Sequence, residues 1–200
     1  MASAITNKGD SNEISKDILN IPLEREWVFW HKDANKLKGD KNNWDYGEKI
    51  CNIDTPGAFW RVYNNIKHPE GPNCLDDSND YYLFVKGINP KYEDPNNING
   101  GEWRISIKRN KNKRHEELNT YFVHTCLFCI GETLNEDHTI INGVTLNIRK
   151  REDRICVWLK TCDKSQIINI GERLRNWNNL SSTISVRFQT FKGNKVILEI

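Results

Sequence analysis

Aromatic residues in polar surroundings are the most chemically suggestive feature of this sequence. Seven of its 200 residues are tryptophan, and one of them, Trp44, lies in a loop rich in lysine and asparagine. Tyr92 lies in a long loop interrupted by prolines, directly before Glu93 and Asp94. Two aromatic faces can hold a flat base, at about 1–3 kcal/mol per stacked base and more when the base is cationic. A neighbouring carboxylate could accept two hydrogen bonds from a guanine edge, each contributing about 1.5–3 kcal/mol.

A basic turn supplies the matching chemistry for an anion. In the segment NIRKREDR, Arg149 and Arg154 flank a tight turn, so both could reach one anion, and a guanidinium matches phosphate oxygens. Trp158 follows on the strand predicted after this turn. Taken singly, such an aromatic residue more often fills a core or covers a loop, and such a run of charges is more often a solvated hairpin tip. The combination indicates a site for a base that carries phosphates.

No catalytic signature accompanies these residues. The sequence lacks the nucleophile elbow, the phosphate loop, the zinc-protease helix and the dinucleotide-binding glycine motif, and its five histidines are scattered. Cys126 and Cys129 form a C-x-x-C pair, but they lie in an apolar helical pattern, and no second pair has zinc spacing. We therefore expect mostly buried, reduced thiols, no metal and no enzymatic activity. The acidic run DDSND at residues 76–80 is more simply interpreted as a solvated turn than as a metal site.

The composition limits the class of partner. The 29 lysines and arginines almost balance the 27 aspartates and glutamates, so the net charge of +2 excludes a global basic field, and any anion site must be local. Apolar runs fall far short of the about 18 residues that a membrane span needs, and the N-terminus lacks the apolar core of a secretory signal. We expect a disordered tail over residues 1–20, one domain over residues 21–200, and a location in the cytoplasm, with the nucleus as a second compartment.

Strands and helices alternate unevenly along the predicted domain. Short runs of hydrophobic and aromatic residues predict strands at 24–31, 49–53, 81–86, 103–109, 144–149, 154–160, 183–191 and 195–200. Helices are predicted from Thr55 and Pro56 onward, over about His115–Gly131 and over Lys164–Asn176. Strands joined by long loops, with helices between some of them, indicate an α+β fold with a largely antiparallel sheet.

Two of these helices leave apolar residues away from their core-facing sides. In the first, Phe59 and Tyr63 belong to the predicted buried face, and Trp60 lies about 100° from it. In the second, Val123 and Leu127 point largely away from the predicted core stripe. That stripe consists of Leu118, Phe122, Cys126 and Cys129.

Four longer segments form a recognisable set: TPGAFWRVYNNI, YYLFVKGINPKYEDPNNINGGEW, LFCIGE and NIRKREDRICVW. Together with Trp44 and the run EWVFW near the N-terminus, they resemble the translation initiation factor 4E family, the messenger-RNA cap-binding proteins. The resemblance covers about residues 21–190. It implies a strongly curved, largely antiparallel sheet with three long helices on the convex face. The ligand of such a protein is the cap, a 7-methylguanosine linked through a triphosphate, and the family uses no metal or other cofactor.

The cap site implied by the resemblance combines stacking aromatics, a guanine-binding carboxylate, a contact to the N7-methyl group and a phosphate clamp. In that order, the matching residues are Trp44 and Tyr92; Glu93; Trp158; and Arg149 and Arg154, with Asn147 as a weaker candidate.

The resemblance also implies a protein-binding surface on the convex face. Its partners would be the factor 4G scaffold and regulatory 4E-binding proteins, which insert a helix bearing Tyr-x4-Leu followed by a hydrophobic residue. A monomeric chain is expected to bind them. The matching positions are Pro22, Trp60, Val123, His124 and Leu127.

Three positions depart from the family pattern. Tyr92 stands where relatives commonly have tryptophan, which predicts slightly weaker cap binding. His124 stands where they usually have a glutamate that pairs with a basic residue of the partner. Glu102 stands where they often have arginine, which removes one basic contribution near the phosphates. Two alternatives stay open: a regulatory paralogue that binds the cap but not the scaffold, and a decapping hydrolase, which would need a carboxylate-rich metal site.

Overall fold

The computed structural model describes residues 18–33, 47–69, 75–109 and 117–200. Its centre is one sheet of eight strands in the order β2-β1-β3-β5-β6-β4-β7-β8. Every neighbouring pair in this sheet is antiparallel, as predicted. The strands are β1 (Trp27–Asp33), β2 (Glu48–Ile53), β3 (Asn79–Val85), β4 (Gly101–Lys108), β5 (Ile141–Asn147), β6 (Glu152–Leu159), β7 (Ser185–Thr190) and β8 (Val196–Glu199).

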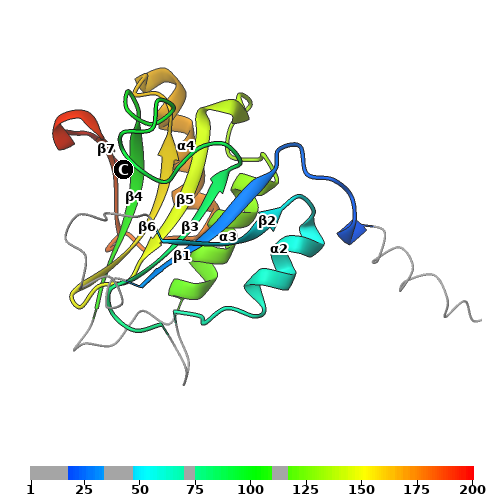
Figure 1. Cartoon of the computed structure of the whole chain (residues 1–200). Helices are drawn as coiled ribbons and strands as arrows, with labels where there is room; N and C mark the ends of the chain where they lie inside the picture. Colours follow the sequence, from blue (N-terminus) through cyan, green and yellow to red (C-terminus); the bar gives the residue numbers. More distant parts are fainter. Residues whose placement is uncertain (1–17, 34–46, 70–74, 110–116) are drawn as a thin grey trace, which may run out of the picture.

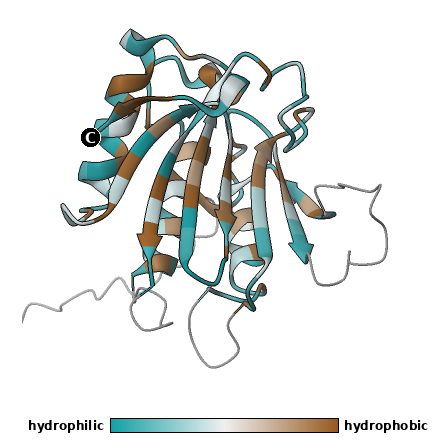
Figure 2. Ribbon diagram, turned by 90° about the vertical axis from the view of Figure 1, so that its left-hand side faces the viewer, coloured by the Kyte–Doolittle hydropathy of each residue, from teal (hydrophilic) through white to brown (hydrophobic). Residues whose placement is uncertain are grey.

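Three helices cover one face of the sheet. They are α2 (Pro56–Tyr63), α3 (Leu118–Ile130) and α4 (Lys164–Trp177), labelled in Figure 1. The opposite face is concave, with hydrophobic and hydrophilic residues alternating along its strands (Figure 2). This is the α+β architecture with a curved antiparallel sheet that the sequence predicted. Among the described residues, no helix has the length and apolar character to cross a bilayer.

The alternation of side chains along β4 separates the core from the concave face. Trp103, Ile105 and Ile107 are buried in the main hydrophobic cluster beneath the helices, and the residues between them point to the other side of the sheet. The indole Nε1 of Trp103 donates a hydrogen bond of 2.9 Å to the carbonyl oxygen of Ile167 on α4. Gly171 lets this helix approach, because a Cβ there would lie 2.4 Å from the Trp103 ring. One strand thus supplies both the core and the functional face.

Helix α3 confirms the predicted core stripe. Leu118, Phe122, Cys126 and Cys129 are all buried, whereas Val123 and Leu127 are only half-buried. The helix begins at Leu118, later than the predicted His115, which lies outside the described residues. It lies in the middle of the helical layer and packs against both β5 and β6. This position explains why further residues, among them Tyr121 and Ile130, are buried as well.

Helix α2 starts as its sequence predicts. The side chain of Thr55 accepts a 3.1 Å hydrogen bond from the backbone N–H of Ala58, and Pro56 occupies the first turn. The helix ends at Tyr63.

Some predicted strand ends were wrong. β1 begins at Trp27 rather than Glu24, because the preceding residues are tied to other elements; the backbone N–H of Leu23, for example, donates to the carbonyl oxygen of Asp54 at 2.8 Å. The strands β5 and β6 each start two or three residues before their predicted positions. The Trp44 loop and residues 1–17 of the predicted tail lie outside the described residues.

Candidate functional site

A cavity of about 440 Å³ opens on the concave face, between strands β3 to β6 and the loop that precedes β4. Six of the seven residues predicted to bind the cap line this one cavity. They are Tyr92, Glu93, Asn147, Arg149, Arg154 and Trp158. The seventh, Trp44, lies outside the described residues. The roles of these residues remain predictions, but the fold brings together six side chains that are up to 66 positions apart in the chain.

Cross-strand register explains the convergence. Asn147 on β5 lies opposite Arg154 on β6. Arg154, Cys156 and Trp158 follow one another on the same face of β6, because alternate residues of a strand point the same way. Trp158 in turn lies opposite Glu102 on β4. The basic end and the aromatic end of the site are therefore two ends of one stretch of β6.

Aromatic rings form the apolar end of the cavity. Tyr92 stacks on Trp158 with ring centroids 4.9 Å apart and planes 10° apart, and Phe191 contacts Trp158 at 4.4 Å. A base between Tyr92 and Trp158 would need a spacing of about 7 Å, since each stacked contact takes about 3.5 Å. A base in this site must therefore use the outer face of Tyr92, where a second aromatic residue would complete the stack. Tyr92 is 53% exposed and Trp158 only 4%.

The asparagine-rich loop that carries Tyr92 and Glu93 is held by a buried aspartate. The carboxylate of Asp94 accepts hydrogen bonds from the backbone N–H groups of Asn89 and Asn96, both at 2.9 Å. Burial alone would raise the pKa of Asp94, but these hydrogen bonds and those from the two side-chain amides outweigh it and lower the pKa. The loop is thus fixed around an ionised carboxylate.

Two further asparagines attach this loop to the sheet. The side-chain amide of Asn97 donates to the carbonyl oxygens of Asn89 and Lys91 at 2.9 and 2.8 Å. The amide of Asn142 on β5 donates to the carbonyl oxygen of Asn96 and to the side-chain oxygen of Asn97. This scaffold was not predictable from the sequence, because asparagine marks turns throughout the chain and its type alone gives no sign of these partners.

The two arginines of the predicted phosphate clamp are held by carboxylates. Arg149 donates from both terminal nitrogens to Asp80, at 2.6 and 3.1 Å, and Arg154 donates from Nε to Glu152 at 2.8 Å. Burial would lower the pKa of Arg149, but the hydrogen bonds and negative charge of Asp80 raise it, so this arginine stays charged. Asn147 donates to Asp80 at 3.0 Å. In this arrangement it orients the carboxylate that holds Arg149.

A fully buried aspartate fixes the turn between β5 and β6. Asp153 is 0% exposed; it accepts hydrogen bonds from the Arg109 guanidinium at 3.0 and 3.1 Å and from the backbone N–H of Arg149 at 3.1 Å. Arg109 also binds Asp77 at 2.7 Å. Two carboxylates of the DDSND run, those of Asp77 and Asp80, are therefore engaged by arginines. Within the described parts of the chain, no group of three or more potential ligands could hold a metal ion.

Several residues of the cavity wall were not predicted from the sequence. Arg104 on β4 and Tyr82 on β3 line the cavity, as do Lys32 and Cys156. The two-residue period of the segment WRISIKR was the available signal, because it places Arg104 on the same face as Glu102. Burial raises the pKa of Tyr92 to about 12, with the negative charge of Glu102 as the next contribution, so the Tyr92 phenol is neutral at physiological pH.

On the convex side, the predicted partner residues form a partly exposed surface over α2 and α3. Trp60, Val123, His124 and Leu127 are all half-buried. Trp60 packs edge-on against Tyr63 with ring centroids 5.7 Å apart. The two helices are joined where the Tyr63 hydroxyl donates to the side-chain oxygen of Asn119 at 2.8 Å.

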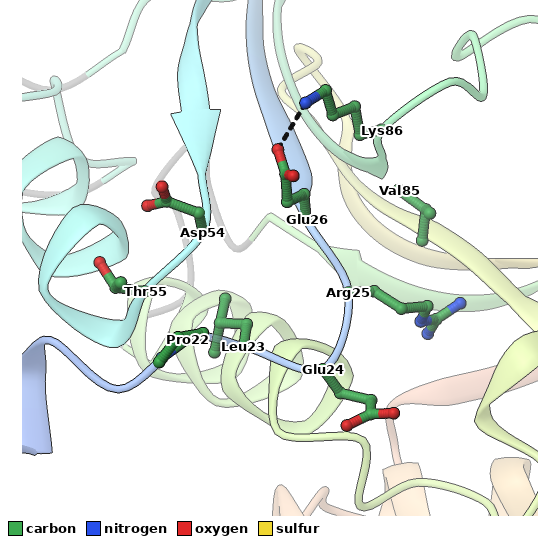
Figure 3. A pocket seen from close by; sticks show the side chains of 9 residues that line it. All are labelled: Pro22, Leu23, Glu24, Arg25, Glu26, Asp54, Thr55, Val85 and Lys86. Carbon is green, nitrogen blue, oxygen red and sulfur yellow. Dashed lines mark hydrogen bonds and ion pairs between the residues drawn. The ribbon is translucent and has the colours of Figure 1, made fainter.

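Pro22 is exposed and lines two hollows beside these helices. One, of about 610 Å³, is bounded by the segment 22–26, the start of α2 and the end of β3, and Glu26 and Lys86 pair across it at 2.6 Å (Figure 3). The other, of about 460 Å³, reaches the C-terminal end of α3. Arg25 anchors the segment by donating to both carboxylate oxygens of Glu132, at 2.8 and 2.7 Å.

The chain is similar to proteins of one family. The model of the family "Eukaryotic initiation factor 4E" matches residues 22–196. Translation initiation factor 4E of Candida albicans is 33% identical over 179 residues, which are 88% of this chain and 83% of that protein. The human factor 4E is 29% identical over 196 residues, 92% of this chain and 85% of that protein.

Solved structures agree with these relatives. The Ascaris suum eIF4E-3 complex with m7G cap superposes with a TM-score of 0.78 at 28% identity, covering 90% of this chain and 97% of that one. The complex of Caenorhabditis elegans eIF4E-3 with the 4E-binding protein Mextli and a cap analog has a TM-score of 0.76 at 27% identity, covering 90% and 98%. The family model, the relatives and the shared architecture lead to one conclusion: this chain belongs to the eukaryotic initiation factor 4E family.

Proposed function

We propose that this chain binds the 7-methylguanosine triphosphate cap of messenger RNA and acts in translation initiation. The observation that carries the proposal is the cavity on the concave face, where Tyr92 and Trp158 lie at one end and Arg149 and Arg154 at the other. The cap-bound Ascaris suum relative, with its similar fold, supports it. The chain would act in the cytoplasm by recognition and tethering, without a chemical step.

The geometry suggests how each part of the cap is bound. The outer face of Tyr92 stacks on the base, and its interaction with a cationic ring is favourable because the face of an aromatic ring is electron-rich. Glu93, exposed beside Tyr92, accepts hydrogen bonds from the guanine edge. Arg149 and Arg154 bind the phosphates at the other end of the cavity, where guanidinium groups are already aligned by carboxylates.

We also infer that the convex surface around Trp60 binds a helix of the factor 4G scaffold or of a 4E-binding protein. The Caenorhabditis elegans relative is a precedent, since it forms a complex with the 4E-binding protein Mextli. Half-buried apolar side chains on adjacent helices fit the apolar anchors of such a helix, Tyr-x4-Leu and the residue that follows. The chain would bind this helix as a monomer.

Intrinsic tryptophan fluorescence during titration with 7-methyl-GTP tests cap binding, with GTP as the control. We expect strong quenching by the methylated nucleotide alone, because a cationic base stacked near Trp158 should quench the emission of this tryptophan. The expected dissociation constant is in the micromolar range, which corresponds to a binding free energy of about −8.2 kcal/mol. Equal and weak responses to both nucleotides would contradict cap recognition.

A repressing paralogue is the second candidate, and His124 favours it. This residue is accessible on α3, with its ring 6.1 Å from Phe128, at a position where the resemblance predicts a glutamate that pairs with the partner. If the chain initiates translation with a conventional partner, His124→Glu should raise affinity for a Tyr-x4-Leu peptide by up to about fivefold, the range of an exposed ion pair. A titration that detects cap binding but no peptide binding by either form would instead support the repressor.

A further inference from the structure

Arg104 and Glu102 form an ion pair inside the cavity. Neither residue belongs to the predicted phosphate clamp of Arg149 and Arg154. Arg104 and Glu102 lie on β4, two residues apart, and therefore on the same face of the sheet. The side chains of Arg104 and Glu102 are only 22% and 6% exposed. The Nε and Nη2 atoms of Arg104 both donate to Oε1 of Glu102, the former at 3.0 Å.

The register places Arg104 between the aromatic end and the basic end of the site. Glu102 lies opposite Trp158, Arg104 lies opposite Cys156, and the next residue on that face of β4 lies opposite Arg154. Successive same-face residues on a strand are about 7 Å apart. A cap whose base stacks on the outer face of Tyr92, at the Trp158 end of β6, and whose last phosphate reaches Arg154 therefore passes close to Arg104.

The donors of Arg104 and the local charge both suit an anion. A guanidinium has five N–H groups, and Glu102 engages only two of them. Five cationic and three acidic side chains line this part of the described structure. Burial would lower the pKa of Arg104, but the negative charge of Glu102 raises it, so the guanidinium is held in its charged form.

We propose that Arg104 is a third phosphate-binding residue of this chain and contacts the part of the triphosphate nearest the base. The inference rests on the proposed cap function and deepens it: affinity should depend on the number of phosphates through Arg104 as well as through Arg149 and Arg154. Glu102 is its ion-pair partner, which makes a buried guanidinium acceptable when no ligand is bound.

The test compares ligands that differ only in their phosphates. The affinities of 7-methylguanosine, 7-methyl-GMP, 7-methyl-GDP and 7-methyl-GTP are measured by fluorescence titration for the wild type and for Arg104→Gln. We expect the variant to lose about tenfold or more in affinity for 7-methyl-GTP, the size of a charge-assisted hydrogen bond, and less than twofold for the nucleoside. The first phosphate should account for most of the loss.

Two further variants make the result interpretable. Arg104→Gln leaves Glu102 buried without its partner and could fail to fold, so the double variant Glu102→Gln with Arg104→Gln removes both charges and should show the same loss. Arg187→Gln is the matched control, because Arg187 lies directly opposite Arg104 on β7 but does not line the cavity. It should leave all four affinities within twofold of the wild type.

Three outcomes would overturn the proposal: an equal loss for nucleoside and triphosphate, an equal loss with Arg187→Gln, or no loss in the variants that fold. Failure of the cap function gives a different result, because the wild type would then bind GTP as well as 7-methyl-GTP. Arg104 would in that case be tested by the same phosphate series of unmethylated guanosine. A wild type that binds neither series overturns both proposals.

Discussion

The concave and convex faces of this protein present different kinds of side chain for recognition. On the concave face, the phosphate-binding candidates are charged and are held by carboxylates: Arg149 by Asp80 of β3, and Arg154 by Glu152 of its own strand, β6. On the convex face, the predicted recognition groups are apolar side chains that helices leave half-buried, such as Trp60 and Leu127. The first face therefore depends on exact register and charge pairing, whereas the second depends on helix packing and exposed area. A substitution on one face should therefore leave binding at the other face unchanged.

Among these substitutions, the loss of Asp153 should cause the largest change in free energy, by destabilising the turn beside the concave face. Replacement by alanine leaves the buried Arg109 with one carboxylate fewer and frees the turn that carries Arg149. We expect the free energy of unfolding to fall by about 3–5 kcal/mol, measured by urea denaturation.

The matched control for Asp153→Ala is Asp77→Ala. Asp77 binds the same Arg109 at 2.7 Å, but its side chain is 33% exposed. Water can replace it, so its loss should cost about 1 kcal/mol or less. Similar losses for the two variants would mean that burial does not decide the strength of these pairs.

Trp60→Ala should separate the convex face from the cavity. A tryptophan at the centre of a protein interface commonly contributes about 2 kcal/mol or more, so affinity for a Tyr-x4-Leu peptide should fall about 30-fold or more. Affinity for 7-methyl-GTP should stay within twofold. Trp177→Ala is the control, because Trp177 is an exposed tryptophan of the helical face but lies on α4 against Phe128. Equal peptide loss for the two variants would move the binding surface away from Trp60.

Glu93→Gln should lower the affinity for the cap and leave the affinity for the peptide unchanged. The substitution keeps the size of the side chain but removes the charge that would accept two guanine hydrogen bonds, so cap affinity should fall about tenfold or more. Peptide affinity, measured in the same preparation, should not change. Glu172→Gln, on the exposed side of α4, controls for the loss of one negative charge. A Glu93 variant that binds the cap normally would assign guanine recognition to another group.

Tyr92→Trp should have the smallest effect, and it tests how strongly the ring at position 92 distinguishes a cationic base from a neutral one. An indole face attracts a cation more strongly than a phenol face. Because a whole cation–π contact at a partly exposed site contributes about 0.5–1 kcal/mol, 7-methyl-GTP should bind more tightly by up to about fivefold. Affinity for GTP should change less, because its base is not cationic. The prediction fails if tyrosine binds the methylated nucleotide as tightly as tryptophan does.

Much of the fold was predictable because it follows from local patterns. The cap of α2 at Thr55 and the core stripe of α3 depend on residue spacing within one element, and the antiparallel sheet was inferred from the order of strands, loops and helices along the chain; all three were confirmed. Strand ends were predicted less well, since the start of β1 depends on where Leu23 and Arg25 find partners in distant segments.

For the candidate site, the amino-acid sequence specified only which side chains are present: aromatic residues beside Glu93, and arginines around one turn. It did not determine which groups meet. The pairing of Arg149 with Asp80, the stacking of Tyr92 on Trp158 and the position of Arg104 in the same cavity were decided by the register of β3, β5, β6 and β4. The physical reason is that a strand specifies only which of its residues share a face. Which residue of another strand lies opposite is set by the packing of the whole sheet against its helices.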